Sequence, residues 1–409
     1  MNEANWYKLD NVSFYYASLN NKKRPTVFRF SCYLNDDIDK DYLQIALKET
    51  IHEFPNFHVN LKKGFFWYYL EESSQDIQVV KEENPICSKL VYDDNDLLYL
   101  VSYYKNRINL EMSHILSDGR GALEFFKYLI TTYVKYNYKK NIKVDSASSE
   151  MDRIEDSYDK YFKKSNKVKS HNKNIYKYKA PVLKDKTRYY EVHTNVNKVL
   201  ELAHNHNVSL TTYLVSVLIY SILQEFKVRD YNKLIKIEIP VDLRGFYKSQ
   251  SLKNFFGLMS VDFRPSRGNL EFDEIVKVVN EEMKNRITVE NLESRTNKMV
   301  SFQKLIAARM LPLFIKEIGM RTIDKFVSKM NTSSLSNVGV VKFDKTVEKY
   351  IKSVVVLTST EGFQHTIVSC KDDLCIGISS IYKYNNIIRN YIRYLKEQGV
   401  DIYINTEII

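Results

Sequence analysis

Ser113-His-Ile-Leu-Ser-Asp-Gly-Arg-Gly121 is the stretch of this 409-residue chain that decides its fold. It lies between an alternating, strand-like run and an amphipathic, helix-like run. His114 leaves the end of the strand, where an imidazole can point into a cleft. Asp118 stands at the head of the helix, where a carboxylate accepts backbone N–H groups and stays ionised. Gly119 is expected to supply the backbone freedom of a tight strand-to-helix turn.

Two interpretations of this turn compete. An Asp-Gly pair before a helix is often only a cap and a turn, and a nearby His is often a core residue with its hydrogen bonds satisfied. The other interpretation is catalytic, with the His as an acid or base. Segments further along the chain favour the catalytic one.

Three later segments extend the pattern. They are Ile239-Pro-Val-Asp-Leu-Arg-Gly-Phe246, Asn254-Phe-Phe-Gly257 and Ser336-Asn-Val-Gly339. Together with His-x-x-x-Asp-Gly they resemble, in order and separation across nearly the whole chain, the chloramphenicol acetyltransferase-like superfamily of CoA-dependent acyltransferases. This superfamily includes alcohol acetyltransferases, plant BAHD acyltransferases and condensation domains of nonribosomal peptide synthetases. Condensation domains usually carry two adjacent His in the motif, whereas Ser113 holds the first position here, which favours the stand-alone acetyltransferase branch.

The resemblance implies an α/β fold of two-layer sandwich type, with two chloramphenicol acetyltransferase-like subdomains facing each other around a central channel. Residues 1–159 would form the N-terminal subdomain with the motif, residues 160–187 a Lys-rich linker, and residues 188–409 the C-terminal subdomain. Strand-like runs of Val, Ile, Tyr and Phe alternate with helical patterns in both halves, as mixed sheets flanked by helices require. Because one chain carries both halves, we expect a monomer.

The resemblance also implies the roles of the motif residues. His114 is the general base, since a neutral His with a pKa of about 6.5 can take the acceptor's proton and return one to the leaving thiolate. Asp118 is structural and pairs with an Arg, for which Arg244 is the candidate; Gly119 completes the turn.

The tetrahedral intermediate of acyl transfer carries a negative oxygen that needs hydrogen-bond donors. Ser336 and Asn337 are candidate donors from the late strand, with the neighbouring Thr332 to Ser334 as alternatives, and Asn254 has similar standing. Ser-Asn before a Gly is also an ordinary turn signature, so both interpretations stay open here.

The net charge of +11 is concentrated in one segment. Residues 160 to 186 hold ten Lys and one Asp, which gives 10 − 1 = +9. A polar run of this kind is usually a solvated linker. It would also attract the phosphates of CoA or an acidic acyl carrier protein. No regular nucleic-acid-binding motif accompanies it, so nucleic acid is not an expected partner.

Several classes of site are not expected. Cys32, Cys87, Cys370 and Cys375 lack the close spacing of a metal site and are interpreted as buried, reduced thiols. His204-Asn-His206 has no accompanying Cys or carboxylate cluster, so we expect no metal. There is no Gly-rich phosphate loop, so neither ATP nor NAD is expected, and acyl-CoA is a donor co-substrate rather than a bound cofactor.

The residues before Asp10 lack the basic start and apolar stretch of a signal peptide, so we expect a cytoplasmic protein. A helical stretch is expected over residues 300–330. Within it, the apolar run 305–318 is interrupted by Arg309, Pro312 and Lys316, which predicts a helix lining a core or groove rather than a membrane span.

Three functions remain at this point. The first is an acyl-CoA-dependent O- or N-acyltransferase, similar to the alcohol acetyltransferases, acting on a small alcohol or amine. The second is a condensation-type enzyme whose acyl donor is tethered to a carrier protein. The third is a non-catalytic binding protein on the same fold, against which the intact His, Asp and Gly argue.

Overall fold

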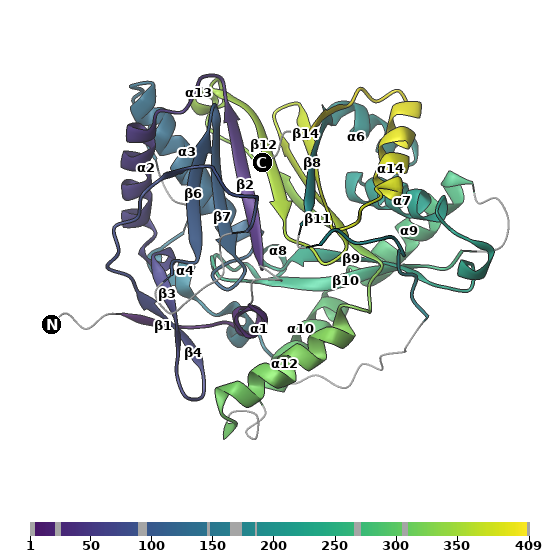
Figure 1. Ribbon diagram of the computed structural model, residues 1–409, viewed down its shortest axis with the longest axis horizontal. Helices are drawn as coiled ribbons and strands as arrows, with labels where there is room; N and C mark the ends of the chain where they lie inside the picture. The colour runs from purple at the N-terminus through teal and green to yellow at the C-terminus, as the bar shows by residue number, and fades with distance from the viewer. Residues whose placement is uncertain are drawn as a thin grey trace.

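The computed structural model describes residues 5–20, 26–88, 96–144, 148–163, 174–184, 186–265, 271–304 and 310–406 (Figure 1). Within these ranges the chain forms three β-sheets with helices packed on them. The mixed α/β class expected from the sequence is confirmed.

A five-stranded sheet carries the motif. Its strands, in spatial order, are β12 (Ile351–Thr358), β2 (Val27–Leu34), β7 (Arg107–Ser113), β6 (Tyr99–Tyr104) and β5 (Val80–Lys81). Helices α2 (Lys40–Glu53) and α3 (Gly119–Asn137) pack together beside it. Alternate residues of β7, such as Ile108 and Leu110, enter the apolar core, because successive side chains of a strand point to opposite faces.

A seven-stranded sheet forms the other half. Its strands, in order, are β10 (Phe256–Phe263), β9 (Ile235–Asp242), β11 (Ser333–Val340), β13 (Phe363–Cys370), β14 (Asp373–Ser380), β8 (Arg188–Asn195) and β15 (Tyr403–Asn405). Four helices share an apolar core with it: α6 (Val196–Asn205), α7 (Leu210–Leu223), α9 (Phe272–Arg286) and α14 (Asn386–Glu397). Figure 1 shows them gathered on one side of this sheet.

One strand from the C-terminal part of the chain joins the sheet of the N-terminal half. β12 comes late in the chain, yet it pairs antiparallel with β2 of the N-terminal half. β12 also packs closely on β14: a Cβ added to Gly377 would lie 2.1 Å from the carbonyl oxygen of Val356, so only glycine fits there. The division of the chain at residues 160–187 stays a prediction, and residues 164–173 and 185 lie outside the described ranges.

The helical stretch expected over residues 300–330 is two helices, α10 (Val289–Lys304) and α12 (Leu313–Val327). Pro312 caps the start of α12, since a proline tolerates the first positions of a helix but not its interior. The run was expected to line a core or groove. In its described part Leu313 does enter the core, but Phe314, Ile315 and Ile318 are exposed, so most of this part does not line a core.

The remaining elements are short. They are a three-stranded sheet of β1 (Trp6–Lys8), β4 (Tyr68–Glu72) and β3 (Val59–Lys63), and the helices α1 (Asn11–Leu19), α4 (Glu150–Ile154), α5 (Ser157–Lys160), α8 (Arg244–Tyr247), α13 (Lys345–Glu348), η1 (Pro55–Phe57) and η2 (Val228–Asp230). The four cysteines are buried and free. No single helix among the described residues has the length and apolar character to cross a bilayer; α6 and α7 meet that test only as a pair, bent by 83°.

Candidate functional site

His114 lies directly after the last residue of β7 and is clamped by aromatic rings. Its ring stacks on Tyr16 of α1, with centroids 4.8 Å apart and planes 19° apart, and lies 4.6 Å from the ring of Phe28 on β2. Its backbone N–H donates to the carbonyl of Thr26 at 2.9 Å. The backbone and ring of His114 are therefore both fixed by neighbouring elements.

The imidazole of His114 is held in its neutral form. Burial lowers the pKa of His114 to about 4, and the nearby Asp118 carboxylate offsets only part of this effect. Nδ1 is shielded from solvent, whereas the residue as a whole is partly exposed. At neutral pH the ring is therefore uncharged, which is the form that can accept a proton.

Asp118 caps the helix that follows. Its Oδ1 accepts from the backbone N–H groups of Arg120 at 3.1 Å and Gly121 at 2.9 Å. Its Oδ2 accepts from the backbone N–H of Phe255 at 2.7 Å, which belongs to the other half of the chain. Asp118 is 5% exposed, so its carboxylate is shielded from solvent. Its hydrogen bonds connect the two halves of the chain.

Arg244 lies against Asp118 in a bidentate pair. Its Nη1 donates to Asp118 Oδ2 and its Nη2 to Asp118 Oδ1, both at 3.0 Å. Nε donates to the carbonyl of Ser251 at 2.7 Å, and Nη2 also donates to that of Lys253 at 2.6 Å. Burial opposes the charge of Arg244, but Asp118 and Asp242 outweigh it and raise the pKa of the guanidinium. Arg244 thus shapes both its own loop and the motif turn.

The glycine that the turn requires is not the one expected. Gly119 is the first residue of α3, has no positive φ, and has open space where a Cβ would stand. At Gly121, by contrast, a Cβ would lie 2.2 Å from the carbonyl oxygen of Leu252 and 2.3 Å from Ser117 Oγ. The need for glycine comes from close packing of the two halves rather than from left-handed backbone.

Asn254 holds the backbone of His114 in place. Its Nδ2 donates to the carbonyl of His114 at 2.9 Å, to Ser13 Oγ at 3.1 Å and to Asp10 Oδ2 at 3.2 Å. These partners occupy the amide, so the structure does not support Asn254 as an oxyanion donor. Burial raises the pKa of Asp10 to about 6, with hydrogen bonds from Ser13 and Asn254 acting against the rise.

Ser336 and Asn337 occupy opposite faces of β11. Asn337 Nδ2 donates to Thr211 Oγ1 of α7 at 2.8 Å, and its Oδ1 accepts from the backbone N–H of Gly339 at 2.9 Å. Ser336 pairs in register with Thr366, whose Oγ1 donates to the carbonyl of Val356 in β12. Ser336 therefore lies on the face turned toward the N-terminal half, and Asn337 points away from it.

Sequence reasoning missed Asp10 and Tyr16, which reach the site through α1. Asp10 and Ser13 have the spacing of a helix cap, and Asp10 Oδ1 does accept from the backbone N–H of Ser13 at 2.7 Å. That signal marks only the start of a helix. Nothing in the local sequence says that this helix packs beside His114.

Ser113, which stands where condensation domains usually carry a His, is fully buried. Its Oγ accepts from the backbone N–H of Ile115 at 3.1 Å, and its backbone N–H donates to the carbonyl of Leu98 at 2.9 Å. The Ser113 side chain therefore stabilises the motif turn by a hydrogen bond, and this position supplies no second imidazole.

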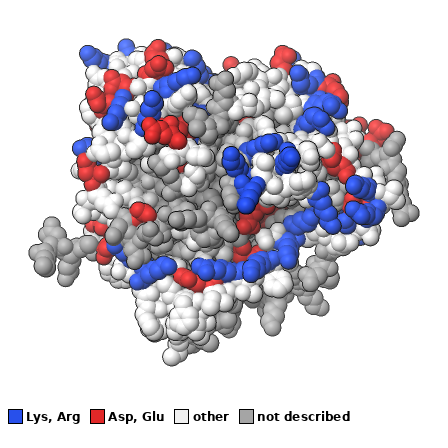
Figure 2. All heavy atoms as spheres, viewed as in Figure 1, with Lys and Arg blue, Asp and Glu red and all other residues white. Residues whose placement is uncertain are grey.

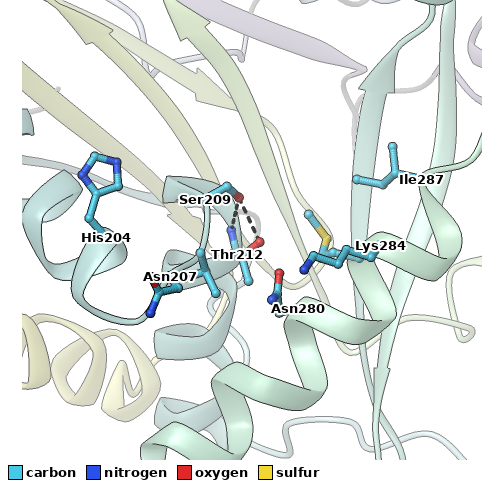
Figure 3. Close-up of a pocket in the computed structure, with 9 residues that line it drawn as sticks. His204, Asn207, Ser209, Thr212, Asn280, Lys284 and Ile287 are labelled. Atoms are coloured by element: carbon cyan, nitrogen blue, oxygen red, sulfur yellow. Dashed lines mark hydrogen bonds between the residues drawn. The ribbon is translucent and has the colours of Figure 1, made fainter.

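A cavity of about 640 Å³ lies apart from the motif, at the α6–α7 turn and the end of α9 (Figure 3). Its lining residues are His204, Asn207, Val208, Ser209, Thr212, Asn280, Met283, Lys284 and Ile287. The nearby His206 pairs with Asp273, its Nδ1 2.9 Å from the carboxylate. Across the described ranges, no group of three or more His, Cys, Asp or Glu side chains is arranged to hold a metal ion.

Comparison by sequence finds neither a matching family model nor a matching curated protein. Comparison of structures finds likenesses over the full length. The first condensation domain of the CDA synthetase superposes with a TM-score of 0.63 at 11% identity, covering 97% of each chain. Trichothecene 15-O-acetyltransferase from Fusarium sporotrichioides gives 0.63 at 7%, covering 96% of this chain and 94% of that one. The starter condensation domain of rhizomide synthetase in complex with C8-CoA gives 0.62 at 10%, covering 97% and 98%.

At these identities the likeness establishes the fold. The chain has the fold of these condensation domains and of this acetyltransferase, which is the fold that the resemblance predicted.

Proposed function

We propose that this chain is an acyl-CoA-dependent O- or N-acyltransferase in which His114 is the general base. The main support is a neutral imidazole, clamped between Tyr16 and Phe28 and followed by a carboxylate that Arg244 holds from the other half of the chain. Domain interfaces are common places for buried ligands. The fold it shares with an acetyltransferase and with a condensation domain bound to C8-CoA agrees with this chemistry.

In the proposed reaction, the acceptor's hydroxyl or amine gives its proton to Nε2 of His114, because Nδ1 is shielded from solvent. The acceptor oxygen or nitrogen then bonds to the thioester carbonyl carbon, whose oxygen becomes negative. When the tetrahedral intermediate collapses, the carbon–sulfur bond breaks and the thiolate takes the proton from the imidazolium. Asp118 and Arg244 act as positioning residues, and Gly119 is the first residue of the helix that Asp118 caps.

Of the candidate oxyanion donors Ser336, Asn337 and Asn254, Ser336 is the one we retain. The side chains of Asn254 and Asn337 donate to protein acceptors, whereas Ser336 is partly exposed on the face turned toward the N-terminal half. Losing one such donor typically costs about 3 kcal/mol of transition-state stabilisation.

A carrier-protein-tethered donor is the second candidate, since condensation domains share the fold. The buried Ser113 in place of their usual first His argues against it. We further propose that the protein acts in the cytoplasm as a monomer. Residues 1–159 and 188–409 would act as its two subdomains, joined by residues 160–187.

The test is thiol release from acetyl-CoA and longer acyl-CoAs over a panel of alcohols and amines, with wild type and His114→Gln in parallel. A second arm offers the same acyl groups on an acyl carrier protein. Turnover with CoA donors that the variant lacks would support the proposal. Turnover only with acyl carrier protein would show that the donor is the carrier-tethered acyl group and not acyl-CoA. Turnover in neither arm would favour a non-catalytic binding role.

A further inference from the structure

We propose that α12 and the turn between β3 and β4 form a surface that docks on an anionic lipid bilayer. This surface, the apolar patch, consists of Phe65, Phe66 and Trp67 on the turn and of Phe314, Ile315, Ile318, Ile323, Phe326 and Val327 on α12. The proposal concerns where the protein sits, and it does not depend on the chemistry proposed for His114.

The helix α12 turns its apolar side outward. Phe314 is 62% exposed, Ile318 61% and Phe326 68%. The residues it packs inward include Glu317 and Asp324, whose carboxylates accept from the hydroxyls of Tyr68 and Tyr15. A surface helix of a globular protein has the opposite arrangement, with its apolar stripe against the core. The outward face of α12 is therefore built to meet an apolar environment.

The β3–β4 turn continues the same surface. The backbone N–H of Leu313 donates to the carbonyl of Phe65 at 2.9 Å, which ties the start of α12 to the turn. Lys316 Nζ donates to the carbonyl of Phe66 at 3.0 Å and lies 3.3 Å from the ring centroid of Trp67. Phe65 itself is 71% exposed. Contiguous exposed apolar area of this kind marks an interaction site.

The charges around the patch are basic. Arg321 and Lys325 of α12 are exposed, as are Lys329 just beyond it and Lys63 beside the turn. Glu317 offsets part of this charge, since its carboxylate lies 3.6 Å from Arg321 and 3.8 Å from Lys63. The two acidic residues of α12 are the inward-packed ones. Figure 2 shows an uncharged area at the bottom of the molecule, where Figure 1 places α12 and the β3–β4 turn, with a row of Lys and Arg above it.

An anionic bilayer fits these features better than a second copy of the chain. Exposed Phe, Ile and Trp side chains enter the headgroup–acyl boundary, and flanking Lys and Arg bind anionic headgroups. Two copies meeting through this patch would bring the same positive charges together, which disfavours a homodimer.

The patch lies one helix away from His114. Arg321 Nε of α12 donates to the carbonyl of Ser18 in α1 at 3.1 Å. Tyr16 of the same α1 stacks on the His114 ring. Docking through the patch would therefore bring the motif side of the molecule close to the lipid surface.

The test is co-sedimentation with vesicles of phosphatidylcholine alone or with added phosphatidylserine. Wild type should bind the phosphatidylserine vesicles more strongly, and salt should weaken that binding. The variant Phe314→Glu/Ile318→Glu should bind roughly tenfold more weakly or worse, since each buried side chain of this size contributes about that factor. The matched control is Met151→Glu/Val228→Glu, which adds the same charge at sites that are 82% and 80% exposed outside the patch, and it should bind better than the patch variant.

A second variant, Phe65→Ser/Phe66→Ser, tests the turn separately and keeps the proposal testable if the helix variant does not fold. Three results would overturn the proposal: no wild-type binding to either vesicle, equal binding by the patch and control variants, or a wild-type dimer without lipid that the patch variant abolishes.

Discussion

The imidazole of His114 is neutral because of where it lies. Burial lowers its pKa to about 4, so the base form is present above that pH and is lost as the pH falls through it. We predict that the acid limb of the kcat/KM profile falls near pH 4 rather than near the ordinary His value of about 6.5. Measurement of kcat/KM across the acid range checks this, and a limb at the ordinary value would show that the ring is solvated in the working enzyme.

We predict that Asp118→Ala lowers the free energy of unfolding more than Asp39→Ala does. Asp118→Ala removes the buried, bidentate partner of Arg244 and leaves only the more exposed Asp242 beside the guanidinium. Breaking a buried pair of this kind costs about 3–5 kcal/mol of the free energy of unfolding. Asp39 is the natural control, since it also caps a helix through two backbone N–H groups but is exposed. Asp39→Ala should cost only about 1 kcal/mol. Urea unfolding of both variants decides the matter, and equal losses would argue against a stabilising Asp118–Arg244 pair.

At the scale of elements, β12 packs so closely on β14 that a side chain at Gly377 would clash with the β12 backbone. Gly377→Ala places a Cβ 2.1 Å from a backbone oxygen of β12, which cannot move as a side-chain end would. We predict a loss of about 1–3 kcal/mol or more, as for overpacked cores. Gly362→Ala, whose Cβ would meet only the hydroxyl of Tyr382 at 4.0 Å, should be nearly neutral. Thermal melts compare the two, and equal midpoints would contradict this packing.

The elements also show what the sequence could predict. The strand-like and helix-like runs expected on either side of the motif are β7 and α3. The motif turn was recognised from its residue spacing, and Arg244 was named as the partner of Asp118 from the resemblance to the acyltransferase superfamily. The sequence did not reveal α1, because the packing of Tyr16 on His114 joins segments 98 positions apart. It also did not reveal that β12 joins the other sheet, since strand pairing between distant segments leaves no local signal.

At the scale of the whole molecule, a buried ionic network lies on the polar face of the N-terminal sheet. Glu82 accepts from Arg29 and Arg107, each at 2.5 Å. Arg107 also donates to Tyr33, which donates to Glu191 of the other half at 2.7 Å. The network therefore links the two halves away from the motif.

Glu82→Ala leaves two arginines buried without their shared carboxylate. We predict a loss of about 3–5 kcal/mol in the free energy of unfolding, the cost of breaking a buried pair. Glu83→Ala, at the exposed neighbouring position, is the control and should be nearly silent. Denaturant midpoints measure both, and an unchanged midpoint for Glu82→Ala would mean that water replaces the lost carboxylate.

The most direct test of the central claim is the single-turnover rate of acyl transfer in wild type and in His114→Gln, with the same acyl-CoA and acceptor. The variant fills the space between Tyr16 and Phe28 without a titrating ring. We predict that the rate falls by roughly a hundred- to ten-thousand-fold, with acyl-CoA affinity and melting midpoint nearly unchanged. A variant that transfers the acyl group at the wild-type rate would contradict the assignment of His114 as the base.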